Sequence, residues 1–271
     1  MTLEELQEWA YNNLDNYKII QSGGAKNTVA VYFTSHNLFY PDTIECFEKA
    51  IKEKDRYEWT RIKINRASKH IFLRDIFKIW YVKGINSKIN SIPQILNFLK
   101  KETEGYDEIV MIGSSAGGTA AALFGSMLDA DIVFDFNGQW EINSSIKKFN
   151  IERLIKLKEE YGIYYDLLNL VYDQNNIFYF VSEKSKWDSD QFIHSQKLKI
   201  NRLFFKTSHH GVPFLKVAIP VVLNMSRNEL SSLSSRHYNP FFFTFKCVGL
   251  KQTIRGLYNQ IHYCPDKIRN M

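Results

Sequence analysis

Three groups of side chains in this 271-residue sequence have the types that nucleophilic catalysis needs. Ser115 is the central residue of the run Gly-Ser-Ser-Ala-Gly at positions 113–117, which fits the pattern G-x-S-x-G. An acidic segment at 182–191 follows later, and a His-His-Gly turn at 209–211 comes after it. A serine becomes a nucleophile when a histidine takes its proton and a carboxylate orients that histidine. The order serine, acid, histidine therefore predicts acyl transfer through a covalent intermediate on Ser115.

The residues around Ser115 predict a tight turn between a strand and a helix, which resembles the nucleophile elbow of α/β-hydrolases. An apolar run, 108–112, precedes the turn, and an Ala-rich run, 118–125, follows it. Gly113 and Gly117 have no Cβ, so the strand and the helix can approach closely. The alternative is a glycine-rich turn of another strand–helix unit or a phosphate-binding loop. That alternative fits worse, because the sequence lacks G-x-G-x-x-G and no Walker lysine follows.

The acid and the base each leave a choice between neighbouring residues. Asp188 is the preferred acid, Asp190 is held in reserve and Glu183 comes third; the unused ones would be solvated loop charges. His210 is preferred as the base because it directly precedes the glycine of its turn, with His209 as the alternative. A histidine pair can also bind a metal, but no carboxylate or cysteine lies nearby at ligand spacing. No metal site is therefore expected.

Acyl transfer also needs backbone amides that stabilise the developing oxyanion. Ala116, the residue after the nucleophile, is expected to supply one of them. The second is expected from the loop after the apolar run 28–33, within Thr34–His36, with Thr34 and Ser35 as the named candidates. His36 in the same loop is interpreted as a loop residue rather than a catalytic one.

Alternating strands and helices are expected to position these residues. Strands are expected at 28–33, 57–62, 108–112, 131–136, 176–181 and 203–205, and helices at 1–21, 42–54, 91–104 and 118–125. This alternation predicts an α/β fold with a doubly wound, mostly parallel sheet. Residues 140–172, which are helical, polar and aromatic, are expected to form a helical cap insertion over the site.

The segment 74–84 has aromatic residues at helix-like spacing and allows two interpretations. The first is a loop plus a helix that packs Trp80 and Tyr81 into the core. The second is that Arg74, Asp75 and Trp80 line the mouth of the site. The first is preferred.

The composition is that of one globular domain over residues 1–271, because 45% of the residues are hydrophobic. No window approaches a membrane span, and the acidic, polar N-terminal segment is unlike a secretory signal. Three scattered cysteines, Cys46, Cys247 and Cys264, are expected as free thiols. Such thiols suit a reducing compartment, so a cytoplasmic location is expected.

The positive charge of the chain is concentrated near its C-terminal end. Residues 196–271 contain twelve lysines and arginines but two acidic residues, whereas the net charge of the whole chain is +6. The segment 216–271 is expected as a basic extension packed on the domain. Its charge suits an anionic partner, such as a phosphorylated cofactor, an acidic polysaccharide, a membrane surface or nucleic acid, or merely a soluble basic face. Within it, 225–271 could cover the sheet edge, form an oligomer contact or touch a membrane-bound synthesis complex.

Three runs together resemble α/β-hydrolase-fold proteins of bacterial capsule and surface-polysaccharide loci. These are Gly-Ser-Ser-Ala-Gly-Gly at 113–118 with its Ala-rich helix, Asn-Gly-Gln at 137–139, and the late His-Gly turn. Some of these proteins are O-acetyltransferases that move acetyl from acetyl-CoA to sugar hydroxyls. The resemblance implies that Ser115, Asp188 and His210 form the catalytic triad.

The resemblance also implies acetyl-CoA as co-substrate, with no tightly bound cofactor, and a polysaccharide or glycan as acceptor. A serine esterase or deacetylase acting on a similar glycan is the second hypothesis. The third is a non-catalytic module that binds a glycan or helps assemble a synthesis complex. Nucleic acid is not expected as a partner, because the basic residues form no recognised motif.

Overall fold

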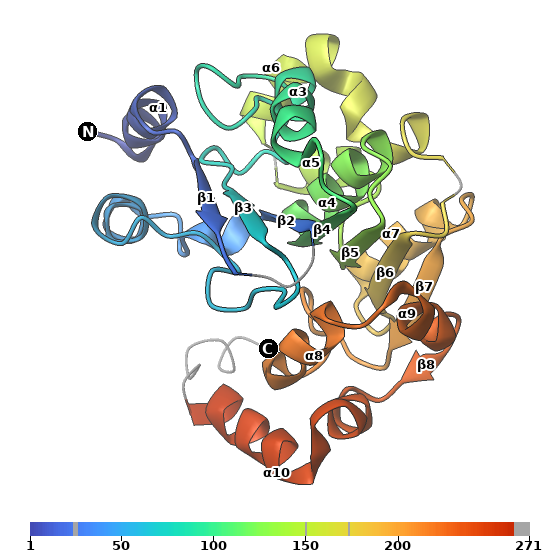
Figure 1. Cartoon of the computed structure of the whole chain (residues 1–271). Coiled ribbons are helices and arrows are strands. Elements are labelled where there is room, and N and C mark those ends of the chain that lie inside the picture. Colours follow the sequence, from blue (N-terminus) through green and yellow to red (C-terminus); the bar gives the residue numbers. More distant parts are fainter. Residues whose placement is uncertain (24–26, 150, 173, 263–271) are drawn as a thin grey trace.

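An eight-stranded sheet forms the centre of the computed structural model, which describes residues 1–23, 27–149, 151–172 and 174–262 (Figure 1). The strands are β1 (Tyr17–Gln21), β2 (Thr28–Phe33), β3 (Lys69–Leu73), β4 (Glu108–Ser114), β5 (Ile132–Phe136), β6 (Ile177–Ser182), β7 (Asn201–Phe205) and β8 (His237–Tyr238). Their order is β1-β3-β2-β4-β5-β6-β7-β8. Strand β1 runs antiparallel to β3, and every other neighbouring pair is parallel. The mostly parallel sheet expected from the sequence is confirmed.

Helices cover both faces of this sheet. The α-helices are α1 (Leu3–Asn13), α2 (Ile44–Phe47), α3 (Ile92–Thr103), α4 (Ala116–Met127), α5 (Asn143–Phe149), α6 (Glu152–Tyr161), α7 (Lys186–Ser195), α8 (Ile219–Leu223), α9 (Arg227–Leu233) and α10 (Pro240–His262). The shorter turns are η1 (His36–Leu38), η2 (Glu48–Glu53, a π-helix), η3 (Gly162–Tyr165), η4 (Leu167–Asn169) and η5 (Lys216–Ala218).

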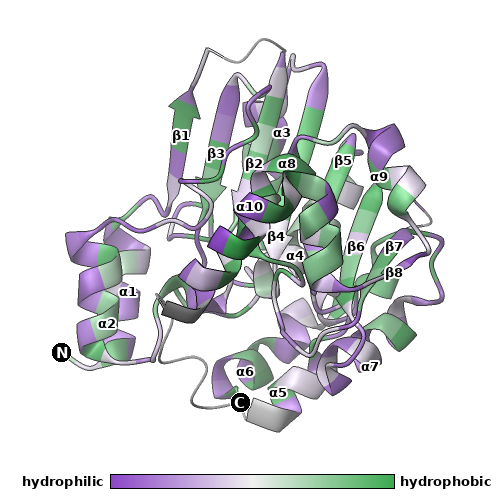
Figure 2. Cartoon of the chain, turned by 90° about the horizontal axis from the view of Figure 1, so that it is seen from below, coloured by the Kyte–Doolittle hydropathy of each residue, from purple (hydrophilic) through white to green (hydrophobic). Residues whose placement is uncertain are grey.

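Two apolar layers lie against the two faces of the sheet, because successive residues of a strand point to opposite sides. On β2, Val31 joins the layer formed with α3 and α4, whereas Tyr32 joins the layer formed with α8 and α9. On β5, Val133 and Phe134 divide in the same way. Figure 2 shows α8 and α10 lying over the second of these faces. A sheet buried on both faces explains why its strands read as continuous apolar runs.

The central strand β4 leads through one tight turn at Ser115 into α4. This strand–turn–helix unit in a doubly wound sheet is the arrangement of the α/β-hydrolase fold. The fold class predicted from the sequence is therefore confirmed.

Four expectations about local structure were wrong or incomplete. Helix α1 ends at Asn13, and the rest of the expected helix over 1–21 is strand β1. The expected strand at 57–62 is a series of turns, and the edge-side strand β3 was not predicted. The segment 74–84 contains turns and no helix. Strands β1 and β3 pair with segments far along the chain, so local periodicity could not identify them.

The region after β5 and the region after β7 add elements around the sheet. The described part of 140–172 consists of α5, α6, η3 and η4. Beyond β7, the short strand β8 pairs with β7, and α8 to α10 follow. Cys46 and Cys247 are free thiols, and Cys264 lies outside the described residues. Within the described residues, no helix combines the length and the apolar character needed to cross a membrane.

Candidate active site

Ser115 has a backbone conformation that is rare for a residue with a side chain. Its φ of 55° and ψ of −126° lie outside the common regions, and it forms the N-terminal boundary of α4. A Cβ at Gly113 would lie 1.9 Å from the Gly117 carbonyl oxygen, and one at Gly117 would lie 2.4 Å from the Phe33 carbonyl oxygen. Both positions therefore require glycine, for the close approach that the sequence predicted.

Three elements bring Ser115, His210 and Asp188 into one hydrogen-bonded row. His210 Nε2 lies 2.8 Å from Ser115 Oγ, and His210 Nδ1 lies 2.8 Å from Asp188 Oδ1. The serine follows β4, the histidine lies in the loop after β7, and the aspartate follows β6. Asp188 is fully buried, whereas Ser115 and His210 are partly exposed. The arrangement can pass a proton from the serine to an imidazole whose other nitrogen is held by a carboxylate.

Asp188 does not lie in a loop, as the sequence analysis assumed. It is in the first turn of α7, where its backbone amide donates to the Ser185 side chain at the helix N-cap. A carboxylate in the first helical turn is favoured by the helix dipole. The helix also gives Asp188 a fixed direction toward the base.

The reserve residues have other positions. Asp190 is exposed on α7, and Glu183 pairs with His237 through a 2.6 Å contact. His209 contributes its backbone carbonyl, which accepts a hydrogen bond from the Ser182 hydroxyl. Of the alternatives left open by the sequence, the structure thus brings only Asp188 and His210 to Ser115.

Asn137 and Ser182 hold the loop that carries His210. Asn137 Nδ2 donates to the Gly211 carbonyl at 2.6 Å and to Ser182 Oγ at 2.7 Å. The Ser182 amide donates back to Asn137 Oδ1 at 2.8 Å. Asn137 has a φ of 53°, which asparagine tolerates better than most residues. The sequence analysis gave Asn137 no role, although an asparagine directly after a buried strand was a signal for such a turn.

The sequence analysis also gave no role to Trp187. Its ring stacks on the His210 ring, with centroids 5.4 Å apart and planes 2° from parallel. An aromatic face against an imidazole suits the cationic form that the base adopts after taking a proton. Its position beside Asp188 in the first turn of α7 was the available signal.

The amides near Ser115 correct the prediction for the oxyanion site. The amides of Ala116 and His36 donate no hydrogen bond to any described residue. The Thr34 amide, however, donates to the Leu73 carbonyl at 3.1 Å. The Ser35 amide donates to a Glu58 carboxylate oxygen at 2.8 Å, and the Ser35 hydroxyl donates to the other at 2.9 Å. Thr34 and Ser35 are thus engaged elsewhere, which leaves Ala116 and His36 as candidate donors.

A second buried carboxylate, Asp135, lies beneath the site. Its Oδ1 accepts from the Gly138 amide at 2.7 Å, and its Oδ2 is buried with no hydrogen-bond partner among the described residues. Asp188 Oδ2 is buried without a partner as well. Burial, with a smaller effect of the Asp188 charge, raises the pKa of Asp135 to about 8. This raised pKa favours the protonated form of Asp135 at neutral pH.

Arg74, Asp75 and Trp80 have structural positions, as the preferred interpretation held. Arg74 is buried and pairs with Asp55 at 2.9 Å. Asp75 accepts hydrogen bonds from four backbone amides of the turn that follows it. Trp80 donates to the Gln139 side chain at 2.8 Å and packs edge-on against the His36 ring. Burial lowers the pKa of His36 to about 3, so this ring is neutral.

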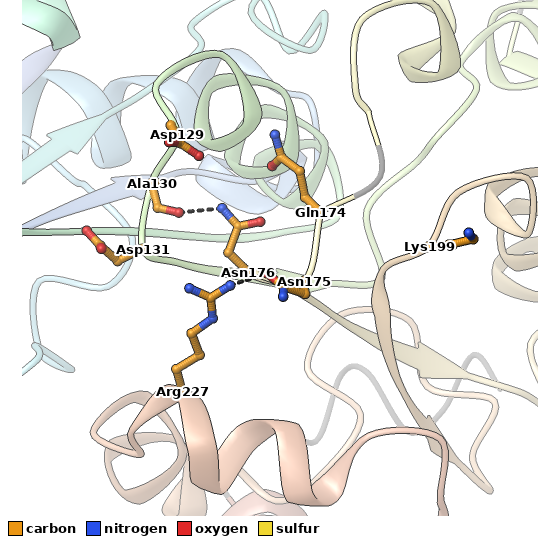
Figure 3. A pocket seen from close by; sticks show the side chains of 8 residues that line it. All are labelled: Asp129, Ala130, Asp131, Gln174, Asn175, Asn176, Lys199 and Arg227. Atoms are coloured by element: carbon orange, nitrogen blue, oxygen red, sulfur yellow. Dashed lines mark hydrogen bonds between the residues drawn. The ribbon is translucent and has the colours of Figure 1, made fainter.

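A polar cavity of about 500 Å³ lies away from these residues (Figure 3). It is lined by Asp129, Ala130, Asp131, Gln174, Asn175, Asn176, Lys199 and Arg227, with Arg227 hydrogen-bonded to Asn175. These residues precede β5, β6 and β7, or belong to α9, whereas the Ser115 row follows the other ends of parallel strands. The cavity therefore lies at the opposite ends of the parallel strands from the row of Ser115, His210 and Asp188. Among the described residues, no group of three or more histidine, cysteine or acidic side chains could hold a metal ion.

Comparison with known proteins supplies structural relatives but no sequence relative. No protein-family model matches the chain, and no curated protein matches it. Among solved structures, the capsule O-acetyltransferase of Neisseria meningitidis serogroup A is similar at a TM-score of 0.47 and 14% identity, over 71% of this chain and 83% of that one. An arylesterase is similar at 0.45 and 14%, over 86% and 91%. Acetyl xylan esterase 1 from Thermoanaerobacterium is similar at 0.40 and 9%, over 69% and 70%.

Proposed function

We propose that the chain is a serine-dependent acyl-transfer enzyme that works through an acyl-enzyme on Ser115. The observation that carries this proposal is the row Ser115–His210–Asp188, with both contacts at 2.8 Å, on a turn whose serine has a strained backbone. Such strain persists only where the surrounding structure imposes it, and it is concentrated at functional sites. The same geometry argues against a non-catalytic module.

The first half of the reaction forms the acyl-enzyme. His210 Nε2 takes the Ser115 proton as Oγ forms a bond to the acyl carbonyl carbon. The carbonyl oxygen becomes an oxyanion, which the free Ala116 amide, at the N-terminus of α4, would stabilise. The tetrahedral intermediate then collapses, the bond from the carbonyl carbon to the leaving sulfur or oxygen breaks, and His210 returns its proton to the leaving group.

The second half transfers the acyl group to a hydroxyl. His210 takes the proton of the acceptor as its oxygen attacks the acyl carbon, and then protonates Ser115 Oγ as the ester bond breaks. Asp188 holds the imidazole orientation and its charge throughout. Trp187 keeps the ring in the plane that serves both steps.

We propose acetyl-CoA as the donor and a hydroxyl of a bacterial capsular or surface polysaccharide as the acceptor. The support is the sequence resemblance of the elbow, the Asn-Gly-Gln turn and the His-Gly turn to proteins of polysaccharide loci. The excess of basic residues in 196–271 is compatible with an anionic donor or polymer. Hydrolysis is the second candidate, because the His210 side chain is 32% exposed and water can reach it.

Labelled acetyl-CoA tests this proposal directly. The wild type, Ser115→Ala and the matched control Ser114→Ala would be incubated with it, denatured and analysed for label on the peptide that contains residue 115. Label on the wild type and Ser114→Ala, absent from Ser115→Ala, supports acetyl transfer. Hydrolysis of a simple acetyl ester without labelling by acetyl-CoA would favour the esterase. Neither activity from a protein with a native circular-dichroism spectrum would overturn both.

A further inference from the structure

The C-terminal half of α10 exposes its large apolar residues. Leu250, Ile254, Leu257 and Tyr258, the apolar stripe, are 55%, 54%, 39% and 58% exposed. Their spacing of four, three and one residues places them on one side of the helix. Gly249, with a φ of 78° and a ψ of 168°, divides α10 into two helical segments, and two further exposed rings, Phe242 and Phe245, lie on the segment before it.

In this C-terminal half of α10, the side that faces the protein contains the small residues Thr253 and Gly256. Thr253 is fully buried, and its hydroxyl donates to the Gly249 carbonyl at 2.8 Å. A Cβ at Gly256 would lie 2.6 Å from a methyl carbon of Val217, so the helix packs closely on η5 through this face. Figure 2 shows α10 on the outside of the layer that covers this face of the sheet. A surface helix of a globular protein usually buries its apolar stripe. Here the stripe is turned outward.

The charges beside the stripe are all positive. Lys246, Lys251 and Arg255 are exposed, and none of them forms an ion pair within the part of the chain that the structure describes. Helix α10 contains no aspartate or glutamate. Lys251 and Arg255, four residues apart, lie on neighbouring turns directly beside the stripe.

We propose that this helix docks the protein on an anionic lipid surface. An amphipathic helix that lies in a membrane interface buries an apolar face at the acyl boundary and places lysine and arginine among anionic headgroups. The stripe, with Lys251 and Arg255, supplies these two parts on the helical segment that follows Gly249. Large apolar residues left in water by a soluble domain are a mark of such an interaction site.

A second copy of the chain fits this surface less well. In a two-fold dimer the same patch is present on both subunits. The basic residues of two copies would then face one another with no acidic residue on the helix to balance them, and like charges across an interface are unfavourable. A surface with its own negative charge removes this repulsion.

Vesicle sedimentation tests the proposal with the full chain. Wild type is expected to sediment with phosphatidylcholine vesicles that contain phosphatidylglycerol, and to be released by salt. Ile254→Asp is expected to abolish binding, whereas Ile155→Asp, at a similarly exposed isoleucine on α6, should bind as wild type does. Replacing Lys251 and Arg255 by glutamine should weaken binding roughly fivefold for each residue, and this variant retains the apolar stripe if Ile254→Asp fails to fold.

Three results would overturn the proposal. One is wild-type protein that stays in the supernatant with anionic vesicles. Another is a dimer in light scattering that Ile254→Asp dissociates, without vesicle binding by either protein, since the occupant would then be a second copy. The third is a melting temperature that falls by several degrees in Ile254→Asp but not in Ile155→Asp, together with no vesicle binding by the wild type. Another part of the chain would then cover the stripe.

Discussion

Helices α4 and α10 use small residues in the same way and differ in what they do with large ones. Gly117 and Gly118 bring α4 against β2 and the turn after β5, as Gly256 brings α10 against η5. In α4, however, Leu123 and Phe124 are also buried, whereas the large apolar residues of α10 that follow Gly249 are exposed.

Close packing through small residues therefore serves a different purpose in each of the two helices. Close approach on every side makes α4 rigid, and that rigidity holds Ser115 within hydrogen-bond distance of a base on another loop. Close approach on one side anchors the C-terminal half of α10, while the apolar stripe on its other side is exposed. We therefore expect substitutions in and around α4 to affect chemistry and stability, and those on the stripe of α10 to affect neither.

The largest effect is expected for the acid of the site. Asp188→Asn should lower kcat/KM toward a soluble acetyl ester by roughly 10⁴-fold, because the asparagine favours the wrong imidazole tautomer. The matched control Asp190→Asn, on the exposed side of the same helix, should stay within about twofold. Leu257→Ala on α10 should also stay within about twofold. Equal losses for Asp188→Asn and Asp190→Asn would contradict the assignment of the acid.

The second effect concerns stability. Phe124→Ala should lower the free energy of unfolding by about 3–5 kcal/mol, because the ring is fully buried and stacks on Phe33 at 5.6 Å. Urea denaturation followed by circular dichroism measures it. A loss below about 1 kcal/mol would mean that α4 is not packed as tightly as described.

The third prediction concerns the buried carboxylate of Asp135, whose contribution to stability depends on pH. The pKa of Asp135 is raised to about 8 in the folded state, above its unfolded value, so its contribution to stability is lost as pH rises toward 8. Between pH 6 and 8 the wild type should lose up to roughly 1.4 kcal/mol per pH unit relative to Asp135→Asn. The contributions of the other titrating groups cancel in this difference, since both proteins contain those groups. Denaturation curves at pH 6, 7 and 8 that run parallel for the two proteins would show that Asp135 is ionised throughout.

The smallest effect is expected on the stripe of α10. Ile254→Ala should change the free energy of unfolding by less than about 0.5 kcal/mol in the absence of lipid, because the side chain is mostly in solvent already. Adding anionic vesicles should then distinguish it from the wild type. A loss of more than about 2 kcal/mol without lipid would mean that Ile254 is buried in the folded protein.

Local sequence was sufficient to predict the elements whose limits are set by residues close to them along the chain. The strand at 28–33 and the capped helix after Ser91 were predicted to within a residue or two, because apolar runs and N-cap residues act over short distances. Strand β3 was missed because its pairing with β1 and β2 joins distant parts of the chain. The run 57–62 was predicted as a strand from its local pattern, but it pairs with no described strand and forms turns.

By itself, the sequence was sufficient to propose Ser115 as the nucleophile and to give the order of the acidic and histidine segments after it. Gly113 and Gly117 mark the turn, and no other residue type fits there. The tertiary structure decided what the order could not. It brought Asp188 rather than Asp190 to His210, engaged the Thr34 and Ser35 amides elsewhere, and turned the apolar side of α10 outward. The physical reason is that hydrogen-bond partners and burial depend on which distant segments meet, whereas a backbone turn depends on the residues within it.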